Sequence, residues 1–316
     1  MFVLTSAKIR RDLREKLVEA NPSITYQFCE SMEEAEEFLP KADVLLTHGN
    51  GLDEQKIEEA VNLKWIMILS AGVDGLPFNK IEEKGIIVTN VRGIHKTQMG
   101  EYAISMLLQV CRQAKILIDQ ERSHDWGRKL NITEISGKTM MVVGTGAIGQ
   151  EVARLAKAFR MHTIGVSSSG QPKEYLDEVY KAGEGMEKVE EADFIVSVLP
   201  STSDTKDFFK KEHFEQMKST AIFLNMGRGD VVSSTVLLNA LQNREIYHAV
   251  LDVFDQEPLP AAHPFWEMPN VTITPHISGM SPEYQPRAIA IYEQNLEAFL
   301  NGNQGYINLV DPRKGY

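Results

Sequence analysis

The stretch Thr139-Met-Met-Val-Val-Gly-Thr-Gly-Ala-Ile-Gly-Gln150 decides the fold of this chain. It begins with a short apolar run and ends on three glycines in the spacing Gly-x-Gly-x-x-Gly. Directly afterwards, Val152, Leu155 and Phe159 recur at helical spacing, with charged residues between them. The pattern therefore predicts a strand, a tight turn and a helix in immediate succession.

Each glycine of this turn has a separate role when a dinucleotide binds. Gly144 permits the turn, Gly146 lets the backbone approach a pyrophosphate, and Gly149 lets the helix pack close to the strand. The first helical residues, Ala147 and Ile148, then offer backbone N–H groups to the phosphates. Glycine turns also occur for purely steric reasons, but the strand and helix patterns on either side favour a dinucleotide site.

The composition indicates a soluble protein of two domains. With 316 residues, two domains are favoured over one, and 43% hydrophobic and 24% charged residues are ordinary for globular proteins. A net charge of −11, without a cluster of Lys and Arg, argues against a nucleic-acid surface. Two cysteines, no signal-peptide pattern and no apolar run of ~20 residues predict a cytoplasmic protein.

The N-terminal part alternates short apolar runs with polar helical stretches, which predicts a parallel sheet with helices on both faces. Loops beyond the carboxyl ends of such strands bind ligands, so 47–51 and 70–74 are candidate site loops. For His48, in the first loop, a ligand contact and an ordinary loop histidine both remain open. The expected strands are 2–4, 24–28, 44–47, 65–69 and 86–89, and the expected helices are 8–20, 32–39, 53–61 and 78–83.

A long helix is predicted over Met99–Ile118, with apolar residues on nearly all of its sides. Such a helix is buried between domains or in a subunit interface, and we expect it to lead into the second domain. The following segment, Arg122–Leu130, is polar and irregular, which predicts a surface excursion.

The second half continues the alternation and completes a doubly wound dinucleotide domain of six strands. A last helix, expected from Ser281 to Asn301, returns to the first domain. The predicted fold class is therefore α/β, with a Rossmann-type cofactor domain over 98–283 and a smaller flavodoxin-like parallel substrate domain over 1–97 plus 284–316. The six expected strands are 140–143, 163–166, 194–199, 221–224, 249–254 and 271–274.

An arginine, a carboxylate and a histidine follow the last three of these strands. They are Arg228, Glu257 and His276. Because the carboxyl ends of parallel strands meet at one edge of a sheet, the three side chains can converge beside a bound nicotinamide. A single loop histidine carries little information, but this combination at three strand ends indicates a catalytic site.

The ordered motifs resemble the D-2-hydroxyacid dehydrogenase family, the NAD(P)-dependent reductases of 2-keto acids, over nearly the full length of the chain. The motifs that carry the resemblance are Ser70–Asp74, Met99–Glu101, Gly144–Gly149, Met226–Arg228, Asp252–Phe254, Glu257-Pro258, His263-Pro264 and Pro275-His276.

The resemblance implies that Arg228, Glu257 and His276 are the catalytic residues. It further implies that the backbone of Ala71, Gly72 and Val73 holds the substrate carboxylate, and that the protein forms a homodimer through its cofactor domain. The cofactor contacts that it implies beyond the glycine motif are Met99, Leu199, Pro200, Thr205, Met226, Gly227 and Asp252, the last meeting the nicotinamide carboxamide.

These residue types suit the reduction of a ketone to a D-2-hydroxy acid. His276 can deliver a proton to the oxygen on which negative charge develops, and Glu257 can orient the imidazole and favour its charged form. Arg228 can bind a carboxylate with its planar fork and polarise the adjacent carbonyl. The related formate dehydrogenases move no proton and carry glutamine in place of Glu257, so the carboxylate favours the hydroxyacid reaction.

The choice of cofactor depends on the loop after the second strand of this domain. NAD-selective folds place an acidic residue there, whereas this chain has Ser167, Ser168 and Ser169. Hydroxyls do not repel a 2′-phosphate and can donate hydrogen bonds to it, and Lys173 is the cation expected nearby. The sequence therefore predicts that NADP(H) is moderately preferred over NAD(H). The alternative is a merely polar turn, with NAD bound through its other contacts.

Two further questions stay open at this level. A dinucleotide-sensing protein that binds other proteins, like the corepressors of the same family, is the rival to an enzyme. Glyoxylate, hydroxypyruvate, pyruvate and longer 2-keto acids all remain candidate substrates.

His263 and Trp266 are candidate site residues or ordinary loop residues, and no Cys, His or carboxylate cluster has metal-ligand spacing.

Overall fold

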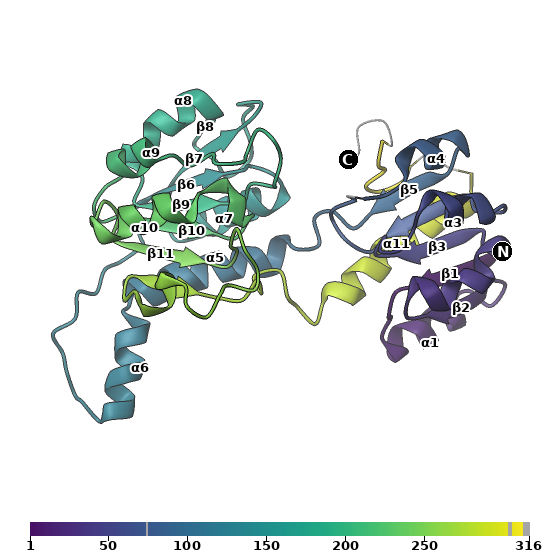
Figure 1. Ribbon diagram of the computed structural model, residues 1–316, viewed down its shortest axis with the longest axis horizontal. Helices are drawn as coiled ribbons and strands as arrows, with labels where there is room; N and C mark the ends of the chain where they lie inside the picture. Colours follow the sequence, from purple (N-terminus) through teal and green to yellow (C-terminus); the bar gives the residue numbers. More distant parts are fainter. Residues whose placement is uncertain (74, 303–304, 312–316) are drawn as a thin grey trace. The chain divides into compact units, whose positions relative to one another are not determined.

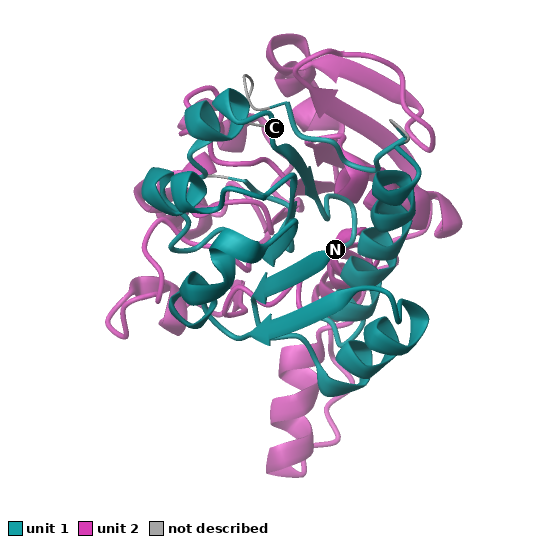
Figure 2. Ribbon diagram, turned by 90° about the vertical axis from the view of Figure 1, so that its right-hand side faces the viewer, with its two compact units in different colours: residues 1–94, 281–316 teal, residues 95–280 magenta. Residues whose placement is uncertain are grey.

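The computed structural model describes residues 1–73, 75–302 and 305–311. The chain divides into two compact units, one formed by residues 1–94 with 281–316 and the other by residues 95–280 (Figure 2). Each unit is built on its own parallel sheet (Figure 1). No helix within the described ranges is long and apolar enough to cross a membrane.

The first unit contains a sheet of five parallel strands in the order β2-β1-β3-β4-β5. The central strands β3 and β4 are short, fully buried and largely apolar because helices cover both faces of the sheet. Their bounds are β1 Phe2–Ser6, β2 Thr25–Cys29, β3 Val44–Thr47, β4 Trp65–Ile68 and β5 Ile87–Asn90. The helices between them are α1 Arg11–Ala20, α2 Met32–Ala35, the 3₁₀ helix η1 Glu36–Lys41, α3 Glu54–Glu59 and α4 Phe78–Glu83.

The last helix, α11 (Tyr284–Leu300), packs on this first sheet although 193 residues lie between the end of β5 at Asn90 and its own first residue. Tyr292 is fully buried and stacks on Trp65 of β4, with ring centroids 5.5 Å apart. Ile289 and Leu296 join the same hydrophobic cluster as Leu13 of α1. The tail helix thus completes the first unit, as the sequence predicts.

The second unit contains a sheet of seven parallel strands in the order β12-β11-β10-β9-β6-β7-β8. Six of these strands lie where the sequence predicts them: β6 Thr139–Val143, β7 His162–Ser167, β9 Phe194–Ser197, β10 Ile222–Asn225, β11 His248–Leu251 and β12 Val271–Ile273. The seventh, β8 (Glu178–Lys181), was not predicted. It is a partly buried edge strand, so it lacks the apolar run that marks the central strands.

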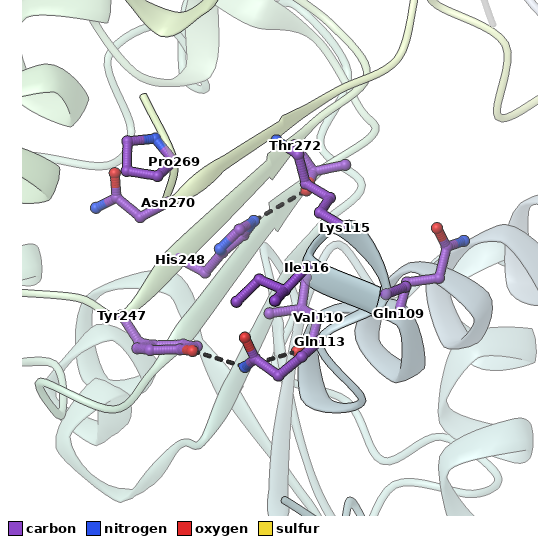
Figure 3. Close-up of a pocket in the computed structure, with 11 residues that line it drawn as sticks. Gln109, Val110, Gln113, Lys115, Ile116, Tyr247, His248, Pro269, Asn270 and Thr272 are labelled. Atoms are coloured by element: carbon purple, nitrogen blue, oxygen red, sulfur yellow. Dashed lines mark hydrogen bonds between the residues drawn. The ribbon is translucent and has the colours of Figure 1, made fainter. Parts of the chain in front are cut away.

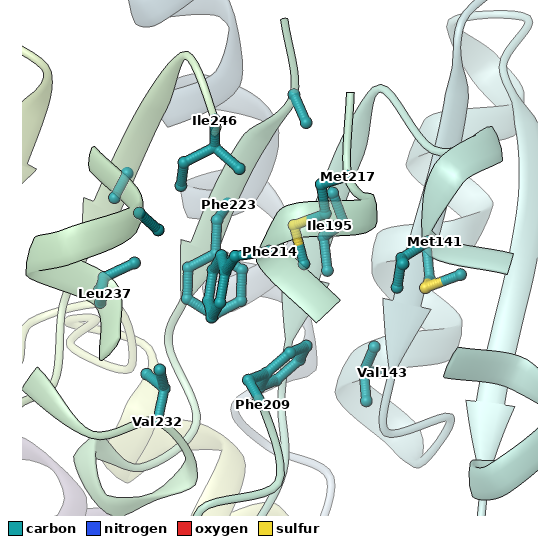
Figure 4. Packing of buried hydrophobic residues seen from close by; sticks show 14 of the residues in the cluster. Met141, Val143, Ile195, Phe209, Phe214, Met217, Phe223, Val232, Leu237 and Ile246 are labelled. Atoms are coloured by element: carbon teal, nitrogen blue, oxygen red, sulfur yellow. The ribbon is translucent and has the colours of Figure 1, made fainter. Parts of the chain in front are cut away.

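Two hydrophobic clusters cover the two faces of this sheet. One contains Phe209, Phe214 and Phe223, whose rings meet edge to face at centroid distances of 4.9 Å (Phe209–Phe223) and 5.4 Å (Phe214–Phe223) (Figure 4). The other joins α5 (Lys96–Cys111) and α7 (Ala147–Ala158) to the sheet. The remaining helices are α7 Ala147–Ala158, α8 Ala182–Met186, η2 Glu187–Glu191, α9 Lys211–Gln216, η3 Gly229–Val231, α10 Ser234–Gln242 and η4 Pro264–Glu267.

The long helix predicted over Met99–Ile118 is broken in the structure, which corrects that prediction. It forms α5 (Lys96–Cys111) and α6 (Ala114–Ser123), separated by Gln113 in the left-handed conformation with φ 59°. The apolar surface of α5 is buried within the unit itself, largely against α7. In contrast, α6 buries no residue and extends away from the seven-stranded sheet (Figure 1).

Candidate functional site

The carboxyl edge of the seven-stranded sheet carries the loops that follow β10, β11 and β12. Arg228 lies two residues beyond Met226, in a turn that Asn225 shapes. The Asn225 side-chain amide donates to the carbonyl of Arg228 at 2.9 Å, and its oxygen accepts from the N–H of Gly227 at 3.2 Å. The Arg228 guanidinium donates one bond, to the carbonyl of Gly227 at 2.8 Å, and has no carboxylate partner among the described residues. Its remaining donors can therefore bind an anion.

His276 and Glu257, which the sequence predicts to act together, are in direct contact. Nδ1 of His276 lies 2.7 Å from Oε2 of Glu257. The other carboxylate oxygen, Oε1, accepts from the backbone N–H of Phe254 at 2.9 Å, which fixes the carboxylate itself. With Nδ1–H directed to Glu257, Nε2 is the ring nitrogen left to exchange a proton with a ligand. The His276 side chain is half-exposed, so a small ligand can reach it.

Asp252 holds the segment that carries His276. It is fully buried at the end of β11, and its carboxylate accepts from the Thr274 hydroxyl at 2.5 Å and from the N–H groups of Ile277 and Ser278 at 2.9 Å each. The Tyr102 hydroxyl lies 2.7 Å from Oγ1 of Thr274 and extends this network into α5, where burial raises the pKa of Tyr102. Sequence reasoning missed Thr274 and Tyr102, because no local pattern links them to Asp252.

A close contact at Gly229, which the sequence does not predict, brings the loops of Arg228 and Glu257 together. A Cβ atom placed on Gly229 would lie 1.8 Å from the carbonyl carbon of Phe254, a separation that no side chain tolerates. The loop after β10 therefore packs backbone to backbone against the loop after β11. Only glycine at this position permits that approach.

The glycine motif has the geometry expected for a dinucleotide site. Gly144 has φ 101°, which favours glycine, and a Cβ on Gly149 would lie 2.0 Å from the Gly144 carbonyl oxygen. A Cβ on Gly146 would instead meet no atom within 4 Å, so open space lies in front of this residue. Helix α7 begins at Ala147, directly beside that space, and its first N–H groups are available to phosphate oxygens.

The other predicted cofactor contacts lie on neighbouring loops at this edge. A Cβ on Gly227 would lie 2.4 Å from the Leu199 carbonyl oxygen, so the loops after β9 and β10 are in contact. The Thr205 hydroxyl closes the first of these loops by donating to the Pro200 carbonyl at 2.6 Å. Met226 is buried beside them.

The serine loop follows β7, and Met99 belongs to helix α5. The hydroxyl of Ser167 accepts from the N–H of Gly170 at 3.1 Å, and that of Ser169 accepts from Gln171 at 3.3 Å; Ser168 is exposed between them. Met99 lies on α5 and is buried in the core, with 8% of its surface exposed. A cofactor contact by Met99 stays a prediction.

The predicted carboxylate-binding loop belongs to the first unit and follows β4. The carbonyl of Ala71 accepts from the Asn90 side-chain amide at 2.9 Å, and the carbonyl of Gly72 accepts from the Ser70 hydroxyl at 2.8 Å. Within the described residues, the N–H groups of Gly72 and Val73 donate no hydrogen bond, so they are available to an anion. Asp74, the last residue of this motif, lies outside the described residues.

Three residues whose roles the sequence left open have the following surroundings. His48 follows β3 and lines a small pocket of the first unit together with Tyr284. His263 accepts from the N–H of Phe265 at 3.3 Å and so caps η4, while the indole N–H of Trp266 donates to the Pro260 carbonyl at 3.0 Å. In the part of the chain that the structure describes, no group of three His, Cys, Asp or Glu side chains can hold a metal ion.

The amino edge of the same sheet carries a separate pocket of about 270 Å³ (Figure 3). His248, the first residue of β11, lies in it and is 8% exposed; its Nε2 atom is 2.9 Å from the Thr272 hydroxyl. Burial and the nearby Lys115 lower the pKa of His248 to about 4. Its surroundings keep this histidine neutral, and its partner is a hydroxyl, whereas the partner of His276 is a carboxylate.

Fold and site define a nicotinamide-dinucleotide enzyme of the 2-hydroxyacid type. The family model for the NAD-binding domain of D-isomer specific 2-hydroxyacid dehydrogenases matches residues 104–278, more than half of the chain. The chain belongs to this family, and it is an enzyme of this NAD(P)-dependent class. The resemblance inferred from the sequence motifs is thus confirmed.

Individual relatives agree with this assignment. A glyoxylate reductase/hydroxypyruvate reductase from Mus musculus is 33% identical, over 79% of this chain and 78% of that protein. Among solved structures, a D-isomer specific 2-hydroxyacid dehydrogenase family protein from Aeromonas salmonicida has a TM-score of 0.85 at 31% identity, covering 98% of this chain and 99% of that one. An NADPH-dependent glyoxylate/hydroxypyruvate reductase from Sinorhizobium meliloti, solved with NADP and sulfate, has a TM-score of 0.79 at 27% identity, covering 100% and 99%.

Proposed function

We propose that this protein uses a reduced nicotinamide cofactor to reduce a small 2-keto acid, of the glyoxylate or hydroxypyruvate type, to the 2-hydroxy acid, with the D configuration where that product is chiral. The observation that carries the proposal is the 2.7 Å contact between His276 and Glu257 at the sheet edge that also carries Arg228. The names of the similar reductases support this substrate class.

His276 delivers the proton in this reaction. When bound, the reduced nicotinamide supplies the hydride to the keto carbon. As negative charge develops on the carbonyl oxygen, His276 donates the proton from Nε2, and Glu257 holds the ring in the required orientation through Nδ1. Arg228 binds the substrate with the guanidinium donors that no carboxylate of the described residues occupies, and it polarises the carbonyl.

The binding residues fit the same reaction. The open space at Gly146 and the first turn of α7 suit the cofactor pyrophosphate. The N–H groups of Gly72 and Val73, which donate to no atom of the described residues, suit the substrate carboxylate next to Ala71. Asp252 is already saturated with internal hydrogen bonds, so its contribution is first of all to hold the His276 segment; a contact with the nicotinamide carboxamide remains part of the proposal.

Residues 1–97 with 284–316 then form the substrate-binding domain, and residues 98–283 form the dinucleotide-binding domain.

We further propose a homodimer formed through the dinucleotide-binding domain. Helix α6 carries the exposed apolar residues Ile116, Leu117 and Ile118, and Trp126 beyond it is 91% exposed, an arrangement that favours an interface. Light scattering tests this: replacing Ile118 and Trp126 by serine should yield monomers, and a monomeric wild type would exclude the dimer.

We propose NADP(H) as the preferred cofactor because the Ser167–Ser169 loop contains no carboxylate to repel a 2′-phosphate. An aspartate introduced by Ser168→Asp should shift the preference toward NADH. The wild-type ratio of kcat/KM for NADPH and NADH is the direct measurement. A ratio that favours NADH by about tenfold or more contradicts the proposal.

The proposed reaction is tested with a panel of 2-keto acids, each assayed with NADPH and with NADH. We expect saturable oxidation of NADPH by glyoxylate or hydroxypyruvate. The glycerate formed from hydroxypyruvate should have the D configuration on chiral chromatography, whereas the glycolate formed from glyoxylate has no stereocentre. An L product contradicts the stereochemical assignment. Cofactor binding without turnover of any acid contradicts the reductase and supports the rival, a dinucleotide-sensing protein.

A further inference from the structure

Strand β8 brings a cation to the serine loop that the sequence does not reveal. β8 pairs in parallel with β7, and the register sets Lys181, the last residue of β8, opposite Ser167, the last residue of β7. Both residues therefore lie at the carboxyl edge of the sheet. The sequence alone indicates Lys173 as the cation, because β8 leaves no apolar run in the sequence and Lys181 is 14 positions further along the chain than Ser167.

The stem of Lys181 lies against the serine loop. Gly170, which ends this loop, has φ 65°, and a Cβ placed on it would lie 2.8 Å from Cγ of Lys181 and 3.1 Å from its backbone nitrogen. The loop is thus folded back onto the residue that carries the ammonium group. The ammonium group of Lys181, at the end of a flexible four-carbon side chain, can therefore reach a ligand bound at Ser167 and Ser168.

Lys181 is exposed and forms no ion pair with any described residue. Neighbouring charges on the same strands already have partners. Asp177 binds Lys157 at 2.8 Å, and Glu178 contacts His162 at 3.0 Å. Lys188, the next lysine along the chain, binds Glu191 at 2.7 Å. Among the residues that the structure describes, Lys181 is therefore a cation without a counter-ion beside the loop assigned to the adenosine ribose.

The serine hydroxyls complement this charge. Those of Ser167 and Ser169 accept bonds from backbone N–H groups, which leaves their hydrogens to be donated. Neutral hydroxyls serve a ribose hydroxyl and a phosphate alike, whereas an ammonium group favours the phosphate, which carries up to two negative charges. The cation therefore contributes more than the serines to the discrimination between NADP(H) and NAD(H).

We propose that Lys181 is a specificity-determining residue that binds the 2′-phosphate of NADP(H). The proposal rests on the proposed function, in particular on the assignment of the serine loop to the adenosine ribose. It differs from the preference for NADP(H) itself, because the loop serines and Lys173 could produce that preference without Lys181.

The test is direct titration of the protein with NADPH and with NADH, followed by cofactor fluorescence, which needs no substrate. Lys181→Met should weaken NADPH binding about tenfold, as expected for the loss of one charge-assisted contact, and leave NADH binding within about twofold. Lys181→Arg should restore most of the NADPH affinity. Lys188→Met, which removes the same charge from the same unit, should change neither affinity by more than about twofold at physiological ionic strength.

The outcomes separate this inference from the proposed function. Wild-type preference for NADPH together with an unchanged Lys181→Met affinity overturns the inference alone, and Lys173→Met then shows whether the loop lysine supplies the charge. Equal weakening of both cofactors by Lys181→Met also overturns it, because that result reports a structural role. A wild type that prefers NADH about tenfold overturns the proposed NADP(H) preference and this inference with it.

Discussion

The two edges of the seven-stranded sheet each carry a histidine, and the two residues have opposite environments. At the carboxyl edge, His276 is half-exposed and contacts the carboxylate of Glu257 at 2.7 Å. At the amino edge, His248 is buried, contacts the hydroxyl of Thr272 at 2.9 Å and lies near the ammonium group of Lys115 (Figure 3). Residue type is the same at both edges, but the partners differ.

This comparison shows how the surroundings assign a histidine its role. A carboxylate partner orients the imidazole and stabilises the imidazolium that proton exchange requires. Burial beside a cation excludes that form, and the pKa of His248 falls to about 4. A histidine fixed in the neutral state serves as a hydrogen-bonding core residue. The following predictions test the two edges separately.

The largest effect is expected from Gly229→Ala. The added Cβ would lie 1.8 Å from the carbonyl carbon of Phe254, so the loop of Arg228 must move away from the loop of Glu257. We expect loss of keto-acid turnover below detection and destabilisation by about 1–3 kcal/mol, the usual cost of overpacking. Thermal unfolding and steady-state assays measure both. Gly183→Ala in α8, where a Cβ meets no atom within 4 Å, is the matched control and should be neutral. A fully active Gly229→Ala enzyme would show that the loop contact is unimportant.

Glu257→Gln should lower kcat about 10–100-fold, since a neutral amide replaces a charge-assisted partner of His276. The amide oxygen can still accept from Phe254, so the loop should remain folded. NADPH binding, measured by fluorescence, should be preserved. Glu212→Gln on α9 is the control for loss of one negative charge. If kcat is unchanged, the contact between Glu257 and His276 does not support proton transfer.

Arg228→Lys should raise KM for the keto acid about tenfold, with a smaller change in kcat, because the planar fork loses one of its two hydrogen bonds. Steady-state kinetics over a range of keto-acid concentrations measure the change. Arg244→Lys, which lies at the amino edge between α10 and β11, should have no effect. An unaltered KM for Arg228→Lys would indicate that other residues hold the carboxylate.

His248→Gln should leave turnover unchanged and alter only the acid stability. Folding lowers the pKa of His248 from 6.5 to about 4, so the unfolded chain binds this proton first as the pH falls. The stability that His248 provides is complete above pH 6.5 and is lost as the pH falls through about 4, a change of about 3 kcal/mol. Urea unfolding measures the free energy of unfolding at pH 7 and at pH 4. Between these two pH values, this free energy should fall less for the variant than for the wild type. An equal loss in both would mean that His248 is not kept neutral by the fold.

The central strands and their loops could be predicted because burial on both faces leaves a mark in the sequence. Val44–Thr47 is a run of buried residues and forms β3 as expected, and the loops after β10, β11 and β12 contain the predicted charged residues. The contact between His276 and Glu257 follows from the same rule. Strand order brings the carboxyl ends of neighbouring strands together.

The parts that could not be predicted depend on contacts between distant segments. β8 is an edge strand of mixed polarity, and without it Lys181 could not be related to Ser167. The break at Gln113 involves neither glycine nor proline, so the Met99–Ile118 pattern reads as one helix. The bonds of Asp252 to Thr274 and Ser278 depend on the strand register.

The most direct test of the account is the single-turnover rate of NADPH oxidation by glyoxylate or hydroxypyruvate in two matched variants, His276→Gln and His248→Gln. The account predicts that His276→Gln lowers this rate by about 10²–10⁴-fold, the contribution typical of a general acid, with NADPH affinity preserved. It predicts that His248→Gln retains the wild-type rate at neutral pH. Equal rates in the two variants would contradict the assignment of proton transfer to His276.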